Sequence, residues 1–195
     1  RMNDADVPEL LWPASSHSGG NRRTFTHSLW VKRGIISSTH QVIFEARDGD
    51  DGSSDNIKWE DGQLAVIYQD GTLGRLKSTA LFRDSNAWYH IVVAVDTTQG
   101  TNTNRVKIYV NGVQLTSFTG TNTYPSQNDQ TRVNMANADQ QWGNTRHPDN
   151  DFGLHGYLAE INFVDGAQLA PTAFGEYNDY GQWIPISPVC TYGTE

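Results

Sequence analysis

The 195-residue sequence has a single cysteine, Cys190, which excludes an internal disulfide and a zinc site built from cysteines. Basic residues are few: 14 Lys and Arg stand against 22 Asp and Glu, for a formal net charge of -8. This balance opposes binding to nucleic acid or to an anionic membrane surface. The aliphatic runs are short, as in Ile91 to Val95, whereas a membrane-spanning helix needs about 20 apolar residues. We therefore expect neither a nucleic-acid partner nor membrane insertion.

The apolar material is concentrated in large side chains that are separated by turns. Hydrophobic residues make up 36% of the chain and aromatic residues 11%, beside 18 Gly. Aromatic residues favour strands and glycine favours turns, so the composition is typical of a β-rich protein. The length is typical of one β-sandwich domain. We predict one domain over residues 1–186, followed by a C-terminal connector over residues 187–195.

Short period-two segments recur along the chain, and no sustained helical period is present. The alternating residues that should share one strand face are Phe25, His27, Leu29 and Val31; Val42, Phe44 and Ala46; Leu64, Val66 and Tyr68; and Tyr157, Ala159, Ile161 and Phe163. Residues 88–96 are nearly continuous in apolar residues and predict a central strand that is buried on both faces. Asn111-Gly112 predicts a tight hairpin with a type I′ turn, because both residues accept positive φ. Polar segments such as 48–55 and 137–151 are expected to be loops. The pattern predicts an all-β, two-sheet antiparallel sandwich of the jelly-roll kind.

A family resemblance rests on residues 88–96 (WYHIVVAVD) followed by residues 106–112 (VKIYVNG). This arrangement resembles the core signature of laminin-G-like domains, which belong with the concanavalin A-like lectins and glucanases. Residues 156–166 (GYLAEINFVDG), with FGE at 174–176 and WIP at 183–185, resemble the laminin-G-like modules of bacteriophage tail and other virion proteins. The resemblance implies a jelly-roll fold, a virion setting and further sequence on either side of this chain.

Catalysis is not predicted. Retaining glucanases need two carboxylates about 5–5.5 Å apart, but Glu160, Asn162 and Val164 supply only one at the alternate positions of the relevant strand. Glu45 and Asp48 are three residues apart and should face opposite sides of a strand. His90 alternates with apolar residues and is expected to be a satisfied sheet histidine.

No cofactor is predicted to be required, and calcium is the candidate if one is bound. Calcium takes six to eight oxygen ligands, and two loops are rich in them. The predicted metal residues are Asp48, Asp50, Asp51, Asp149 and Asp151, with Asp55, Asp139, Asn144 and Asn150 in the same loops. Neither loop has EF-hand spacing, so solvated acidic loops are the alternative. A transition-metal site with His147 and His155 is a further alternative to a plain exposed loop.

A sugar site needs an aromatic plate beside planar polar groups. Trp142 has both in its surroundings, because it lies in a polar segment with no strand pattern, among Asp139, Asn144 and Arg146. Tyr124 is a second candidate. The alternative is that Trp142 folds back over a thin core.

These observations predict a non-enzymatic carbohydrate-binding adhesion module of a bacteriophage particle, a tail fibre or a similar part. It would be extracellular, present in multiple copies, and specific for a glycan of the host cell surface. A decoration or cement protein that contacts other virion proteins is the alternative, and a polysaccharide hydrolase is the third.

Overall fold

The computed structural model describes residues 2, 9–16, 18–36, 40–49, 53–145 and 152–193. Over these residues it contains thirteen β-strands and four single turns of 3-10 helix. The strands are β1 (Leu10–Trp12), β2 (Thr24–Arg33), β3 (Gln41–Arg47), β4 (Ser54–Glu60), β5 (Gln63–Tyr68), β6 (Gly74–Leu81), β7 (Trp88–Asp96), β8 (Val106–Val110), β9 (Val113–Leu115), β10 (Asp139–Trp142), β11 (Gly156–Asp165), β12 (Gly175–Tyr177) and β13 (Trp183–Pro185). The 3-10 turns are η2 (Ala14–Ser16), η3 (Gln69–Gly71), η4 (Asn102–Asn104) and η5 (Pro171–Ala173). No helix among the described residues is long and apolar enough to cross a membrane.

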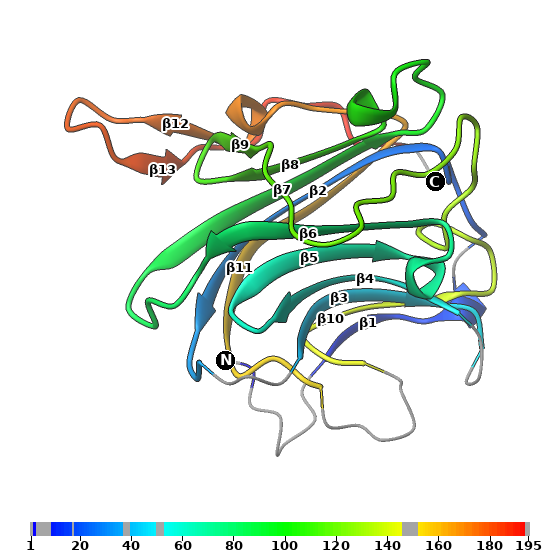
Figure 1. The fold of residues 1–195 in the computed structure, drawn as a ribbon, viewed down its shortest axis with the longest axis horizontal. Coiled ribbons are helices and arrows are strands. Elements are labelled where there is room, and N and C mark those ends of the chain that lie inside the picture. The colour runs from blue at the N-terminus through cyan, green and yellow to red at the C-terminus, as the bar shows by residue number, and fades with distance from the viewer. Residues whose placement is uncertain are drawn as a thin grey trace.

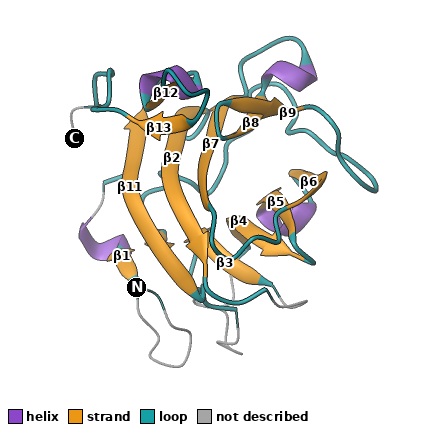
Figure 2. Cartoon of the chain, turned by 90° about the vertical axis from the view of Figure 1, so that its left-hand side faces the viewer, coloured by secondary structure: helices purple, strands orange, loops and turns teal. Residues whose placement is uncertain are grey.

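Two antiparallel sheets face each other, as Figures 1 and 2 show. One has six strands in the order β1-β10-β3-β4-β5-β6, and the other has five in the order β11-β2-β7-β8-β9. The predicted two-sheet sandwich is confirmed. The prediction that residues 88–96 form a central strand is confirmed as well, since β7 is the middle strand of the five-stranded sheet.

The core lies between the sheets and follows the predicted alternation along β2 and β5. Phe25, Leu29 and Val31 of β2 are fully buried. They pack in one cluster with residues of the facing sheet, among them Phe44 of β3 and Trp59 of β4. Since the apolar residues of these strands line the interior, the alternate residues of the six-stranded sheet face outward.

Two β-bulges break the alternation that the sequence predicts. The register shifts between Val42 and Phe44 in β3, so Ile43 joins the core and Val42 turns to the outer face. In β11 the shift falls between Ala159 and Asn162, where Glu160 has φ 48°. The predictions that Val42 shares a face with Phe44, and that residues 157–163 alternate without interruption, are therefore wrong. A bulge adds one residue to one strand and so reverses the facing of the residues beyond it.

The hairpin between β8 and β9 is as predicted, with Asn111 at φ 50° and Gly112 at φ 80°. Both positive values belong to a type I′ turn, whose twist matches that of the flanking strands.

The C-terminal segment covers the outer face of the five-stranded sheet, where the β12–β13 hairpin also lies (Figure 1). Val92 of β7, Val164 of β11 and Phe174 form a second apolar cluster, against which Cys190 packs. The Val189 N–H donates to the Ala173 carbonyl at 2.8 Å. Within residues 187–193, Val189 and Cys190 make these contacts with the domain, and the connector expected to begin at residue 187 stays a prediction.

Candidate functional site

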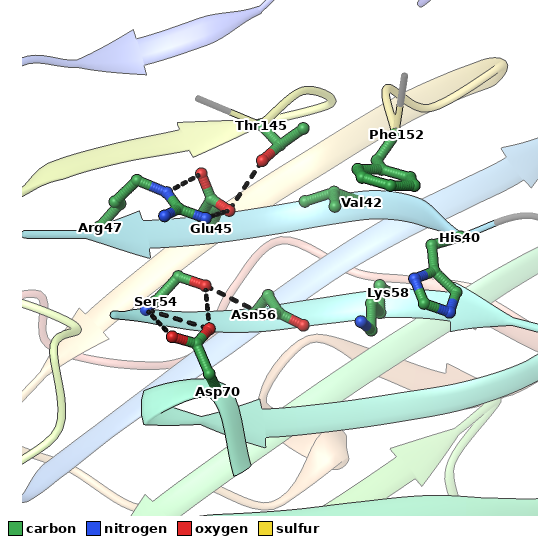
Figure 3. A pocket seen from close by; sticks show the side chains of 10 residues that line it. All are labelled: His40, Val42, Glu45, Arg47, Ser54, Asn56, Lys58, Asp70, Thr145 and Phe152. Atoms are coloured by element: carbon green, nitrogen blue, oxygen red, sulfur yellow. Dashed lines mark hydrogen bonds and ion pairs between the residues drawn. The ribbon is translucent and has the colours of Figure 1, made fainter. Parts of the chain in front are cut away.

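A pocket of about 290 Å³ opens on the outer face of the six-stranded sheet. Figure 3 shows side chains from β3 and β4 on its floor, with Thr145 and Phe152 above them. Its lining residues are His40, Val42, Glu45, Arg47, Ser54, Asn56, Lys58, Asp70, Thr145 and Phe152.

Strand alternation places the floor residues. In β4, Ile57 and Trp59 belong to the core, so the residues between and before them, Ser54, Asn56 and Lys58, face outward. In β3 the bulge brings Val42 to this face beside Lys58, its partner in the register.

A hydrogen-bonded network fixes the Glu45 end of the pocket. The Arg47 guanidinium donates from Nε to Glu45 Oε1 and from Nη2 to Oε2, each at 3.2 Å. Gln141 Nε2 donates to Oε1 at 3.1 Å, and the Thr145 hydroxyl donates to Oε2 at 2.9 Å. Glu45 is only 2% exposed, so its negative charge is desolvated and depends on these donors. The network holds the polar groups in place before any ligand arrives.

Asp70 lines the pocket beside the floor residues Ser54 and Asn56. Asp70 accepts from the Ser54 hydroxyl at 2.8 Å and from the Ser54 backbone N–H at 3.2 Å. Asn56 Nδ2 donates to Ser54 Oγ at 3.3 Å. The other amide atom, Asn56 Oδ1, is buried and has no hydrogen-bond donor among the described residues.

Lys58 and His40 lie at the opposite end, beside Glu60. Lys58 Nζ lies 3.8 Å from Glu60 Oε2, and His40 Nε2 lies 3.9 Å from the same oxygen. The other oxygen, Oε1, accepts from Arg75 at 2.6 Å and from Lys77 at 3.0 Å. Burial lowers the pKa of Lys58 and of His40. Burial alone would raise the pKa of Glu60, but the hydrogen bonds from Lys77 and Arg75 outweigh it and hold that pKa below its usual value.

Apolar groups complete the pocket. Phe152 and Val42 face the space above the polar floor (Figure 3), and the Val42 N–H donates to the Phe152 carbonyl at 2.7 Å. The Phe152 ring centroid lies 5.7 Å from that of His40. An apolar plate beside fixed amide, hydroxyl and charged groups matches the two kinds of surface that a sugar ring presents.

The predicted aromatic sugar site is not formed. Trp142 lies in β10, between β1 and β3, and is only 6% exposed. Its ring packs on Phe44 and His27 in the core, with centroids 5.1 and 6.4 Å away. The prediction that it is an exposed loop residue is wrong, because residues 139–142 pair as a strand; the alternative, that it folds onto the core, is confirmed.

Of the other predicted sugar-binding residues, the three that the structure describes, Asp139, Asn144 and Tyr124, do not line the pocket. Asp139 accepts a hydrogen bond from the Ala14 N–H at 2.7 Å, and Asn144 is buried. Tyr124 is half-buried against the core. Arg146 lies outside the described residues.

The predicted calcium ligands are only partly described. Asp48 lies 3.5 Å from the Arg132 guanidinium. Asp55 is buried and accepts hydrogen bonds from the backbone N–H groups of Gln69, Arg132 and Val133, so it ties three segments together. Among the described ranges, no group of three His, Cys, Asp or Glu residues is placed to hold a metal ion. The remaining predicted ligands, Asp50, Asp51, Asp149 and Asp151, lie outside those ranges, as do His147 and Asn150.

The sequence pattern does not predict the pocket, because residues 48–55 have the composition of a loop and the strand β4 is not predicted. The available signal was the alternation of Ile57 and Trp59 with Asn56 and Lys58. On a strand, such a pattern puts amide and ammonium groups on one face.

The comparisons with known proteins agree with this architecture. Residues 10–171 match the family model described as Concanavalin A-like lectin/glucanases superfamily, called Laminin_G_3. A search of curated proteins finds no match.

Among solved structures, a heptameric SAP-like pentraxin from Limulus polyphemus is 17% identical with a TM-score of 0.56, over 84% of this chain and 72% of the pentraxin. Domain 4 of AbnA, a GH43 extracellular arabinanase from Geobacillus stearothermophilus solved with arabinotriose, is 21% identical with a TM-score of 0.54, over 83% of this chain and 68% of that one. Domains LG4-5 of the mouse laminin alpha1 chain are 13% identical with a TM-score of 0.54, over 97% of this chain and 44% of theirs. At these identities the structures show a shared fold. The family match and the two-sheet topology together establish that this chain belongs to the concanavalin A-like lectin/glucanases superfamily, with a laminin-G-type sandwich.

Proposed function

We propose that the domain binds a glycan in the pocket on the outer face of the six-stranded sheet. The observation that carries this proposal is the combination of an apolar wall, Phe152 and Val42, with a floor of fixed polar groups. Those polar groups are held by one another through the Glu45–Arg47 and Ser54–Asp70 contacts, so binding costs little side-chain ordering.

The fold supports the proposal by analogy. The arabinanase domain of similar fold was solved with arabinotriose, which shows that a sandwich of this type can hold an oligosaccharide. At 21% identity this likeness carries over no residue, so the pocket itself has to supply the argument.

The proposal is one of binding without catalysis. Both oxygens of Glu45 already accept hydrogen bonds, and Asp70 is engaged by Ser54. Carboxylates held in this way are suited to orienting hydroxyl groups rather than to attacking a glycosidic bond. A calcium ion is not needed for a site made of these groups, and we propose that binding persists in EDTA.

A glycan array tests the proposal, followed by calorimetry of the hits. Phe152→Ala removes the aromatic part of the apolar wall and should weaken binding about tenfold or more, because burying a side chain such as phenylalanine contributes about 1.5–3 kcal/mol. Tyr180→Ala, at an exposed aromatic far from the pocket in the β12–β13 turn, is the control and should bind as the wild type does. An array without a hit, or full binding by Phe152→Ala, would contradict the proposal.

We propose a bacteriophage virion as the setting, on the resemblance of residues 156–185 alone. There the domain would be an extracellular adhesion module, tail fibre or similar, that recognises a host glycan. Multiple copies would raise a weak affinity per site through avidity. Reconstruction of an intact particle would test this: the pocket should face the solvent, whereas burial of the pocket against another virion protein would favour the decoration role.

A further inference from the structure

We propose that the pocket selects an acidic glycan, in which a sugar carboxylate binds Lys58 and a neighbouring hydroxyl donates to Asn56 Oδ1. This inference rests on the proposed glycan site and adds the class of sugar. It starts from two groups in the pocket whose hydrogen-bonding capacity is not used by the described residues.

The first group is the Lys58 ammonium. Its side chain is 14% exposed, and its approach to Glu60 is 3.8 Å, which is too long for a hydrogen bond. Among the described residues no hydrogen bond from Lys58 Nζ is found, although an ammonium carries three donors. A cation that is largely removed from water and lacks a hydrogen-bond acceptor is most stabilised by an anionic oxygen.

The second group is the Asn56 amide oxygen. Asn56 is 9% exposed, and Oδ1 has no donor within the described part of the chain. In Figure 3 this oxygen lies on the side of Asn56 that faces Lys58. An unpaired buried acceptor is costly, and a sugar hydroxyl supplies the missing donor. One sugar residue with a carboxylate and an adjacent hydroxyl would satisfy both groups.

The acids around the pocket are already engaged by other donors. Glu45 is paired with Arg47, and Asp70 is held by Ser54. Glu60 accepts from Arg75 and Lys77 through Oε1, and Lys77 also pairs with Asp61. Lys58 thus shares Glu60 with Arg75 and Lys77, and two further pocket acids, Glu45 in β3 and Asp70 in η3, also act on its charge. None of the described acids accepts a hydrogen bond from Lys58 Nζ, so an anionic oxygen of a ligand can bind this ammonium directly.

The test compares matched acidic and neutral oligosaccharides by calorimetry. The probes are trigalacturonate and 3′-sialyllactose, each compared with its own methyl ester. We expect an acidic member to bind at least about tenfold more tightly than its neutral partner, because its carboxylate accepts charge-assisted hydrogen bonds from the ammonium. The preference should weaken as salt is raised.

Three variants locate the effect. Lys58→Gln should abolish the acidic preference, and Lys58→Arg, which keeps the charge, should retain it. Lys107→Gln, in β8 of the other sheet, is the matched control and should leave it unchanged. Circular dichroism and the melting temperature show that each variant is folded.

The outcomes separate this inference from the proposed function. Equal or tighter binding of the neutral partners overturns the acidic selectivity while the glycan pocket stands. Failure of all acidic probes to bind also overturns it, and if the glycan array is empty as well, both proposals fall. An acidic preference that survives in Lys58→Gln overturns the role of Lys58.

Discussion

Trp183 Nε1 donates a hydrogen bond to His90 Nδ1 at 2.8 Å and so joins the β12–β13 hairpin to the central strand of the five-stranded sheet. The two rings are nearly parallel with centroids 5.9 Å apart, and the Trp30 ring stacks on His90 with a centroid distance of 5.0 Å. His90 Nε2 lies 2.9 Å from Ser28 Oγ. Because Nδ1 accepts, a neutral imidazole carries its proton on Nε2, which donates to Ser28. His90 is therefore the satisfied sheet histidine that the sequence predicts.

Trp183→Phe should destabilise the fold by about 1–2 kcal/mol, because it removes the N–H donor and leaves His90 Nδ1 unpaired. Urea unfolding measures this change. Trp88→Phe, at a tryptophan that is 39% exposed, is the control and should change stability by less than about 0.5 kcal/mol. Equal effects of the two substitutions would show that the His90 contact contributes nothing.

Gly112→Ala should cost more than Gly120→Ala. Both glycines have positive φ, at 80° and 72°, so both variants carry the backbone strain of an alanine, about 1–2 kcal/mol. A Cβ at Gly112 would lie 2.6 Å from the Trp183 ring, whereas a Cβ at Gly120 meets no atom within 4 Å. We expect Gly112→Ala to lower the melting temperature further and to shift the near-ultraviolet signal of the tryptophans. Equal losses of stability in the two variants would mean that the Trp183 ring moves away from the added Cβ of residue 112 without an energetic cost.

The stability should carry an acid-sensitive contribution from two buried histidines. Burial lowers the pKa of His27 to about 3 and of His90 to about 4, from 6.5. Their contribution is present in full above pH 6.5 and is lost as the pH falls, because the unfolded chain binds the protons first. For His27, the lowering of the pKa from 6.5 to about 3 corresponds to a loss of folding stability on the order of 5 kcal/mol once the pH is below about 3. Asp55 opposes this trend, since burial raises its pKa to about 6 and protonation then favours the folded state.

His27→Phe separates these effects. His27 packs among Phe25, Phe44 and Phe163, and neither ring nitrogen has a partner among the described residues. A phenylalanine removes the buried unsatisfied groups and should stabilise the protein by about 1 kcal/mol at pH 7. Its advantage over the wild type should grow as the pH falls from 6.5 to 3.5. Urea titration measures the difference in the free energy of unfolding between the variant and the wild type. If that difference is the same at every pH in this range, the lowered pKa of His27 is contradicted.

Trp142→Ala should destabilise the domain by about 3–5 kcal/mol, because it empties a site in the core. Trp142→Phe keeps most of the packing and should bind glycans as the wild type does. Loss of binding by the folded Trp142→Phe variant would revive the sugar site that the sequence predicts around this residue.

The sequence predicts the sandwich but not the site, because alternation and turn patterns depend on contiguous residues whereas the site depends on segments far apart in the sequence. The strand 88–96 and the Asn111-Gly112 hairpin are encoded in contiguous residues, so alternation and turn chemistry suffice. The bulge at Val42 depends on pairing with β4, which lies beyond the reach of a local pattern. Trp142 was misplaced because β10 is a short polar strand whose burial depends on β1 and β3 on either side of it. The pocket forms only where β3, β4, Thr145 and Phe152 come together. A local sequence pattern does not predict that arrangement, because it depends on the topology of the whole sheet.

Chemical-shift mapping of the isotope-labelled domain with the tightest glycan from the array tests the central claim most directly. We predict that the largest shifts fall on the amides of the outer face of β3 and β4, including Val42, Asn56 and Lys58, and on Phe152. Shifts confined to the five-stranded sheet or to the β12–β13 hairpin would contradict the claim that this pocket holds the glycan.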